Sequence, residues 1–139
     1  MPEIIARKFE WQPDYAVGIE RIDQDHRWLF SAVDRLYQAM LAGQGKKQLE
    51  WLLSGLIEYS QRHFSFEEQL MRQTTYPGSA AHVRQHEEFR RHIGDLYANF
   101  QRGNATITIE ALQFLTGWLA RHTCDCDRAM AEHLKTSSR

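Results

Sequence analysis

Two pairs of potential metal-binding side chains lie close together in the sequence, each at the spacing of one helical turn. His63 is followed by Glu67, and His82 is followed by His86. Residues four apart lie on one face of an α-helix. Imidazole and carboxylate groups placed in this way on neighbouring helices are typical of a buried metal site in a helix bundle. We therefore ask which other residues, and which helices, would complete such a site.

Five of the seven histidines lie at or beside apolar positions of amphipathic segments, namely His26, His63, His82, His86 and His122. A single histidine in such a position is usually a core residue with its own hydrogen-bonding partner. Five of them would need five separate partners, because a buried polar group without a hydrogen bond is costly. A shared cluster of cations would satisfy all five together. We expect the other two histidines, His92 and His133, on the surface.

Apolar residues at helical spacing predict four helices, which would have to position these groups. We expect them at residues 22–41, 46–73, 80–101 and from Thr106 or Thr108 to His133, with Ser79 capping the third. Short connections containing glycine and proline favour an all-α, up-down-up-down antiparallel four-helix bundle. The expected domain covers residues 1–139, with an ordered, aromatic-rich N-terminal arm at 1–20, the bundle at 21–134 and a frayed tail at 135–139.

The five histidines and Glu67 make six candidate groups. They lie early in the first and third helices and late in the second and fourth. Because neighbouring helices run in opposite directions, all six come to the same half of the bundle. None of them is a thiol or thioether, which favours iron, manganese or zinc over copper(I). Five imidazoles exceed what one cation takes from a protein. Two cations bridged by carboxylates, roughly 3.5–4 Å apart or closer, are the economical solution.

The composition excludes several other classes of protein. Formal net charge is −1, from 17 basic and 18 acidic residues, so there is no electrostatic signature of binding to nucleic acid or an anionic membrane. No apolar run approaches the roughly 20 residues needed to cross a bilayer. The N-terminus carries charges where a signal peptide would be apolar, so we expect a cytoplasmic protein. Separately, we expect a monomer. Cys124 and Cys126 would point roughly 200° apart on a helix, so we expect reduced thiols.

Four segments that span nearly the whole chain resemble the bacterial hemerythrins. They read W-x-x-x-Y-x-V-G-I-x-x-I-D-x-x-H from Trp11, H-F-x-x-E-E-x-L-M from His63, Y-P-x-x-x-x-H-x-x-x-H-x-x-F from Tyr76 and W-L-x-x-H-x-x-x-x-D from Trp118. Each motif is weak alone, but the four together, in order and with similar gaps, are specific. The resemblance implies an up-down bundle like that of myohemerythrin and a non-haem di-iron centre.

By position, the resemblance assigns a ligand to each of seven residues. One iron would be held by His82, His86 and His122, the other by His26 and His63, and the two would be bridged by Glu67 and Asp127. The implied cofactor is two iron ions (Fe2+/Fe3+) with an oxo or hydroxo bridge. The two-histidine iron would keep an open position for reversible binding of dioxygen, with no substrate turned over. Leu119, one turn before His122 on the same face, could form the wall of this dioxygen pocket, or could be a core residue only.

Asp127 is assigned by the resemblance and not by simple periodicity. It lies five residues after His122, about 140° away on an ideal helix. Asp125 and Cys126 would face the site better. We therefore predict a widened, π-like turn between His122 and Asp127 that brings the carboxylate inward.

Each ligand histidine should donate its other ring N–H to an acceptor. Asp23, one turn before His26, is a candidate acceptor for its outer ring N–H, or a solvated carboxylate at the start of the helix. Glu68 points about 100° away from Glu67, so we expect it in solvent.

Two other functions remain alternatives. One is a di-iron enzyme with oxidase or nitric-oxide chemistry. Ferritin-like di-iron proteins use Glu-x-x-His pairs, however, and no such pair occurs in this sequence. The other is a sensor of oxygen or iron that acts through a partner protein.

Overall fold

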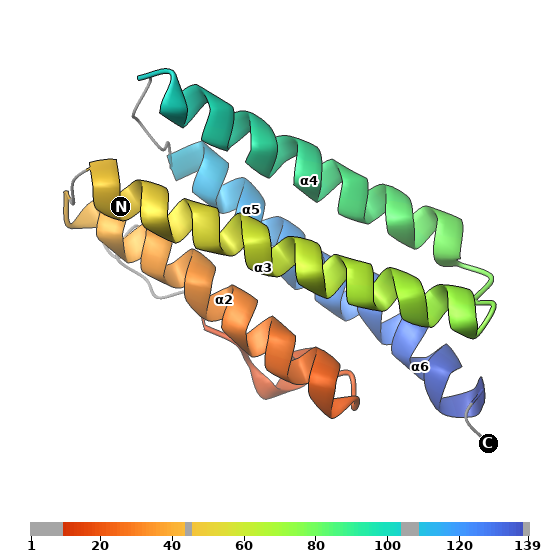
Figure 1. Ribbon diagram of the computed structural model, residues 1–139. Coiled ribbons are helices and arrows are strands. Elements are labelled where there is room, and N and C mark those ends of the chain that lie inside the picture. Colours follow the sequence, from red (N-terminus) through yellow and green to blue (C-terminus); the bar gives the residue numbers. More distant parts are fainter. Residues whose placement is uncertain (1–9, 44–45, 104–108, 138–139) are drawn as a thin grey trace.

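Four helical rods run alternately up and down around one core (Figure 1). The computed structural model describes residues 10–43, 46–103 and 109–137. Helix α2 covers Glu20–Leu41, α3 covers Lys46–Gln73 and α4 covers Ser79–Gln101. The fourth rod consists of α5 (Ile109–His122), the π-helical segment η2 (Thr123–Asp127) and α6 (Arg128–Ser137). A short 3-10 helix, η1 (Pro13–Tyr15), precedes α2. The predicted all-α, up-down four-helix bundle is confirmed.

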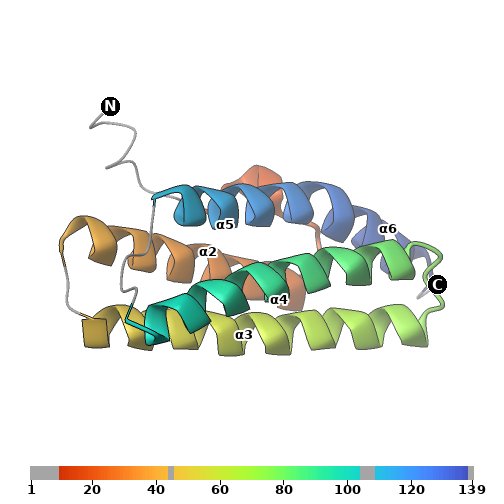
Figure 2. The same ribbon diagram turned by 90° about the horizontal axis from the view of Figure 1, so that it is seen from above.

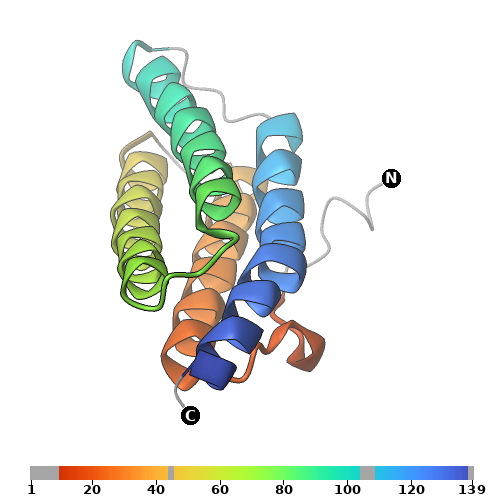
Figure 3. The same ribbon diagram turned by 90° about the vertical axis from the view of Figure 1, so that its right-hand side faces the viewer.

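Each rod packs against two neighbours. Helix α2 lies beside α3 and α5, and α4 also lies beside α3 and α5. Figures 2 and 3 show the same arrangement from above and from the right-hand side of Figure 1, with α5 and α6 forming one continuous rod. Within the described ranges, no helix combines the length and the apolar character needed to cross a bilayer.

The helix ends differ from the expected ones at a few positions. Helix α4 begins at Ser79, so Ser79 is its first residue and not its N-cap; Gly78 takes the cap position without a side-chain hydrogen bond. The fourth rod continues to Ser137, four residues beyond the expected end. The proposed caps Thr106 and Thr108 lie outside the described residues.

The described part of the N-terminal arm, residues 10–19, is packed onto the bundle as expected. Trp11 and Tyr15 contact the main core, and Val17 is buried. The carboxylate of Asp23 in α2 accepts hydrogen bonds from the backbone N–H groups of Val17 (2.8 Å) and Gly18 (3.2 Å). Gly18 has a φ of +87°, a conformation that favours glycine at this turn.

The apolar core is divided into two clusters along the bundle. The larger one fills the half near the α2–α3 connection and includes Leu36, Leu53, Phe89 and Leu112. The smaller one, formed by Val17, Ile22, Met71, Met130 and Ala131, closes the other end. Buried polar side chains occupy the level between the two clusters, so apolar side chains separate them from water in both directions along the axis.

Candidate metal centre

All seven predicted ligands meet at this level between the clusters. They come from every rod of the bundle, and none is more than 4% exposed. Their potential ligand atoms form two groups, in each of which all atoms lie within 4.8 Å of one another. One group holds Glu67, His82, His86, His122 and Asp127, and the other holds His26, His63, Glu67 and Asp127. The two carboxylates belong to both groups.

Glu67 turns its two oxygens toward different groups. Its Oε1 lies 3.1 Å from Nε2 of His86 and 3.2 Å from Nε2 of His82. Its Oε2 lies 2.9 Å from Nε2 of His63. The side chain therefore reaches both the three-histidine group and the two-histidine group from the middle of α3.

Asp127 does the same from the fourth rod. Its Oδ1 lies 2.9 Å from Nε2 of His82 and 3.0 Å from Nε2 of His122, and its Oδ2 lies 2.9 Å from Nε2 of His26. Two carboxylates that each span two sets of imidazoles have the arrangement needed to bridge two cations.

The predicted π-like turn is confirmed, and it explains how Asp127 reaches the centre. Residues Thr123–Asp127 form a π-helical segment, whose wider turn brings positions five apart onto one face. Asp127 is consequently 1% exposed. Asp125 lies on the surface, and Cys124 and Cys126 are free and half-buried. Ideal α-helical spacing would have favoured Asp125, which lies on the surface.

The contacts between these groups are close, but several are not hydrogen bonds. Within the described part of the chain, Nε2 of His26, His63 and His122, Oε2 of Glu67 and both carboxylate oxygens of Asp127 are buried without a hydrogen-bonding partner. Such groups are rare in protein interiors. Their lone pairs approach one another without the alignment of a donor and an acceptor, as expected where they share a cation. The residues therefore fit a site for iron, manganese or zinc.

The outer nitrogen of His63 is held by Asp25. Nδ1 of His63 lies 2.8 Å from Oδ2 of Asp25, whose other oxygen accepts a hydrogen bond from the Tyr59 hydroxyl at 2.7 Å. A carboxylate here places the ring proton on Nδ1 and leaves the Nε2 lone pair available for a metal.

Glu68 plays the same part for His86, which corrects the expectation that it lies in solvent. Its Oε2 lies 2.8 Å from Nδ1 of His86 and 3.1 Å from a guanidinium nitrogen of Arg90. Asp23 was the candidate acceptor for the outer ring N–H of His26. This prediction was wrong, because the Asp23 carboxylate binds the backbone of the N-terminal arm.

A sequence signal for these two carboxylates exists in retrospect. Asp25 directly precedes His26, and Glu68 directly follows Glu67. A residue next to a core-facing residue points about 100° away, toward the seam with the adjacent helix. From there, each carboxylate reaches an imidazole on that neighbouring helix.

Aromatic rings fix two of the imidazoles further. His86 stacks on Phe64, with ring centroids 4.1 Å apart, and His122 stacks on Trp118, at 4.4 Å. Leu119 is buried in the larger apolar cluster, which agrees with a core role and does not test a role as pocket wall.

The two histidines expected on the surface differ in their exposure to solvent. His92 is exposed and stacks on Phe114. His133 is half-buried, and its Nε2 lies 3.1 Å from the backbone oxygen of Thr74, so the surface prediction was wrong for this residue.

The buried charges shift one another's pKa values strongly. Burial alone would lower the pKa of His63, but the charge of Glu67 and the hydrogen bond to Asp25 raise it to about 10. Burial also opposes the charged form of His82, yet the close carboxylate of Asp127 and the hydrogen bond to Glu67 raise its pKa to about 9. Burial would raise the pKa of Glu67, but the nearby His63 charge holds it well below its usual range. Protons thus balance the carboxylates in the metal-free centre, and bound cations would replace them.

Comparison with known proteins gives a consistent result. The family model "Hemerythrin HHE cation binding domain" matches residues 17–134. The chain is 34% identical over 125 residues to a bacteriohemerythrin of Stenotrophomonas maltophilia, covering 90% of this chain and 80% of that protein. It is 30% identical over 120 residues to the myohemerythrin of Sipunculus nudus, covering 85% and 87% of the two chains.

Solved structures agree with the sequence relatives. A wild-type hemerythrin crystal structure superposes with a TM-score of 0.84 at 26% identity, covering 89% of this chain and 95% of that one. Leucine variants of hemerythrin match equally well, with a TM-score of 0.84 at 25% identity. The family match, the relatives at 30% identity or more and the shared bundle all concern the same residues, and this chain therefore belongs to the hemerythrin family.

Proposed function

We propose that the seven side chains hold two iron ions and that the protein binds dioxygen reversibly, as a carrier, a store or a sensor. The observation that carries the proposal is the position of Glu67 and Asp127, each with one oxygen toward three histidines and the other toward two. In this assignment, one ion is held by His82, His86 and His122, the other by His26 and His63, and both carboxylates bridge them.

The unequal number of histidines supports binding of a small ligand at one ion. An ion with fewer protein ligands keeps a coordination position open. A pair of ferrous ions would supply the electrons that reversible binding of dioxygen requires. Five imidazoles and only two carboxylates offer little anionic oxygen to stabilise high-valent iron, which favours binding over oxidation of a substrate.

The remaining residues would keep the centre dry and correctly oriented. Asp25 and Glu68 hold the outer nitrogens of His63 and His86, which orients the inner nitrogens toward the metal. The apolar clusters on both sides of the centre exclude water. Leu119, in the turn that precedes His122, would wall the open position and slow the entry of water.

Anaerobic reconstitution tests this proposal. Metal-free protein is loaded with ferrous iron, iron per chain is measured, and the absorption spectrum is followed through cycles of air and argon. We expect two iron ions per chain and a coloured dioxygen adduct that forms and disappears reversibly. His86→Ala should lose iron and the adduct, whereas His92→Ala, a change on the exposed face of the same helix, should keep both.

Other outcomes would favour the alternatives. Rapid, irreversible oxidation with formation of a product, or consumption of nitric oxide, would indicate an enzyme. One metal ion per chain, or none, would contradict the di-iron assignment.

A further inference from the structure

Two tryptophans mark a groove between α2 and α3, on the outside of the bundle. Trp28 is 43% exposed and Trp51 is 64% exposed, and they are the large apolar side chains left in solvent among the described residues. The groove between them has a volume of about 430 Å³, and no candidate metal ligand lines it. Isolated exposed apolar residues are common, but two large rings on one hollow indicate an interaction surface.

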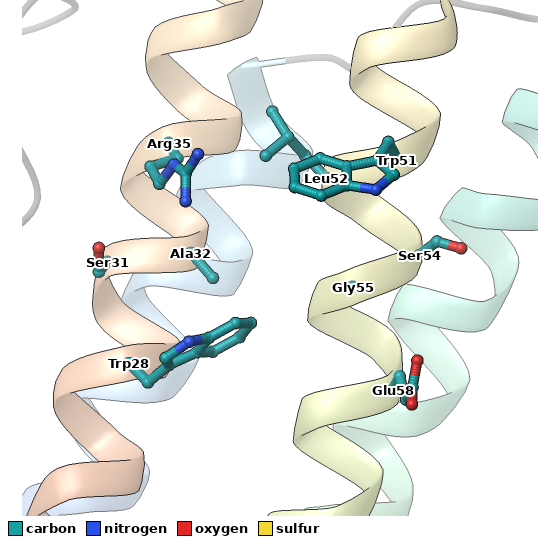
Figure 4. A pocket seen from close by; sticks show the side chains of 9 residues that line it. All are labelled: Trp28, Ser31, Ala32, Arg35, Trp51, Leu52, Ser54, Gly55 and Glu58. Carbon is teal, nitrogen blue, oxygen red and sulfur yellow. The ribbon is translucent and has the colours of Figure 1, made fainter.

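The groove has rigid walls and a floor of small residues. Trp28 stacks on Tyr59, with ring centroids 3.9 Å apart and an angle of 14° between the planes. Ala32 and Gly55 lie between the tryptophans (Figure 4). A Cβ added at Gly55 would meet no described atom within 4 Å, so packing within the chain does not require glycine there. Glycine inside a helix weakens it relative to alanine, and here it keeps the hollow open.

Four side chains mark the corners of the groove. Two are the tryptophans, and the other two, Arg35 and Glu58, carry opposite charges. In Figure 4, Trp28 and Glu58 lie at one end of the groove, and Arg35 and Trp51 lie at the other. The charges therefore sit on one diagonal and the tryptophans on the other. Among the described residues, Glu58 pairs with Arg62 at 3.8 Å on the exposed surface, and such a pair exchanges readily for another.

This pattern is complementary to itself. Trp28 and Arg35 are seven residues apart on α2, a rise of roughly 10 Å. Packed helices are separated by about 8–10 Å, so the four corners form a near-square. A two-fold axis that lies in the surface along the Trp28–Trp51 diagonal exchanges the Arg35 and Glu58 corners and returns each tryptophan corner to itself. Such an axis is what an isologous dimer requires.

We infer that this groove binds a second copy of the chain. In the dimer, Arg35 of each copy faces Glu58 of the other, tryptophan packs on tryptophan, and the α2–α3 pairs cross at a steep angle. The other diagonal axis would place arginine on arginine and glutamate on glutamate. Axes along or across the helices would leave each charge on a tryptophan. The contact area is small, so the dimer is dissociable and replaces the monomer expected from the sequence only at high protein concentration.

Sedimentation velocity of the full, iron-loaded chain over a wide concentration range tests the inference. Wild-type protein should pass from monomer to dimer. Arg35→Glu and Glu58→Arg should each weaken the dimer by at least about tenfold, because like charges then meet. The double variant R35E/E58R should dimerise again, because the opposite charges are restored with their positions exchanged. This recovery separates a direct pair from a general effect of charge.

Glycine variants provide a matched control for the hollow itself. Gly55→Leu should abolish the dimer by filling the groove. Gly94→Leu, on α4, also adds a side chain in open space inside an exposed helix and should leave the dimer intact. Circular dichroism and iron content verify that each variant is folded. A chain that stays monomeric at every concentration, a double variant that does not recover, or a G55L variant that dimerises like wild type would each overturn the inference. So would a groove that captures a different protein from a lysate while the chain alone stays monomeric.

Discussion

A substitution at Asp25 tests whether this residue orients His63 for metal binding or only stabilises the fold. Asp25→Asn removes the charge beside His63 but preserves the size of the side chain. The present carboxylate accepts hydrogen bonds from Nδ1 of His63 at 2.8 Å and from the Tyr59 hydroxyl at 2.7 Å. Asparagine has one acceptor oxygen, but the Tyr59 hydroxyl can rotate and accept from the amide N–H instead. His63 therefore keeps a neutral acceptor and loses only the charge.

The size of the expected effect follows from this loss. Removing such a partner from a metal-binding histidine typically costs roughly 10–100-fold in metal affinity. At about 1.4 kcal/mol for each factor of ten, this is about 1.4–2.7 kcal/mol of binding free energy. Only the ion held by the two-histidine group should be weakened. Glu68→Gln should have the same effect on the other ion, because Glu68 holds His86.

The assay is an anaerobic titration of metal-free protein with ferrous iron in competition with a chelator, which resolves two successive affinities. Asp23→Asn is a matched control, since Asp23 is also a buried aspartate of α2 but binds the backbone of Val17 and Gly18. It should lower the free energy of unfolding and leave both metal affinities unchanged. An Asp25→Asn protein with two unchanged affinities, or an Asp23→Asn protein weakened to the same degree, would refute the reasoning.

Three further predictions concern the centre and its surroundings. The pKa of His63 is raised from 6.5 to about 10, so its stabilising effect in the metal-free protein is complete below pH 6.5 and lost as pH rises toward 10. The pKa of Glu67 is lowered, so its effect is present above pH 4.5 and lost as pH falls. Urea unfolding of metal-free protein should therefore give maximal stability between these values. Leu119→Ala should reduce the free energy of unfolding by about 2–5 kcal/mol and shorten the lifetime of the dioxygen adduct. Asp127→Asn should reduce the iron bound per chain, whereas Asp125→Asn should not.

For each of these three predictions, a specific measured result would contradict it. Metal-free protein that gains stability from pH 7 to pH 9 would contradict the charge balance at the centre. Leu36→Ala, a substitution deep in the larger cluster, should lower stability without changing the adduct lifetime. If Leu36→Ala and Leu119→Ala shorten that lifetime equally, Leu119 is a core residue and no wall. Loss of iron from the Asp125→Asn protein would show that Asp125 binds the metal and would contradict the assignment of Asp127.

Much of the fold could be predicted from the sequence because every rod has a clear apolar stripe. The expected bounds of α3, residues 46–73, agree with the structure at both ends. The starting point of α4 was off by one residue, because helix ends depend on local backbone hydrogen bonds that several neighbouring residues could make. The level at which the histidines meet followed from antiparallel topology alone.

The residues around the ligands could not be predicted in the same way. Periodicity identifies the face that points into the core, and His26 and Glu67 lie on that face. Asp25 and Glu68 lie on the seams between helices, where a side chain is half-buried or exposed depending on the partner helix. Asp127 needed a family resemblance, because the π segment departs from the regular spacing on which periodicity relies.

The π segment also sets the phase of the end of the chain. One additional residue rotates everything after it by about 100° relative to an uninterrupted α-helix. Met130 and Ala131, both fully buried against the N-terminal arm, occupy their positions because of this rotation. If Thr123–Asp127 were a regular α-helix with all its residues kept, Asp127 and Met130 would both turn out of the interior, whereas deletion of one residue would place the aspartate four residues after His122 and keep it on the same face. The widened turn thus links the inward position of the Asp127 carboxylate to the sealing of the bundle's far end, because both depend on the same rotation.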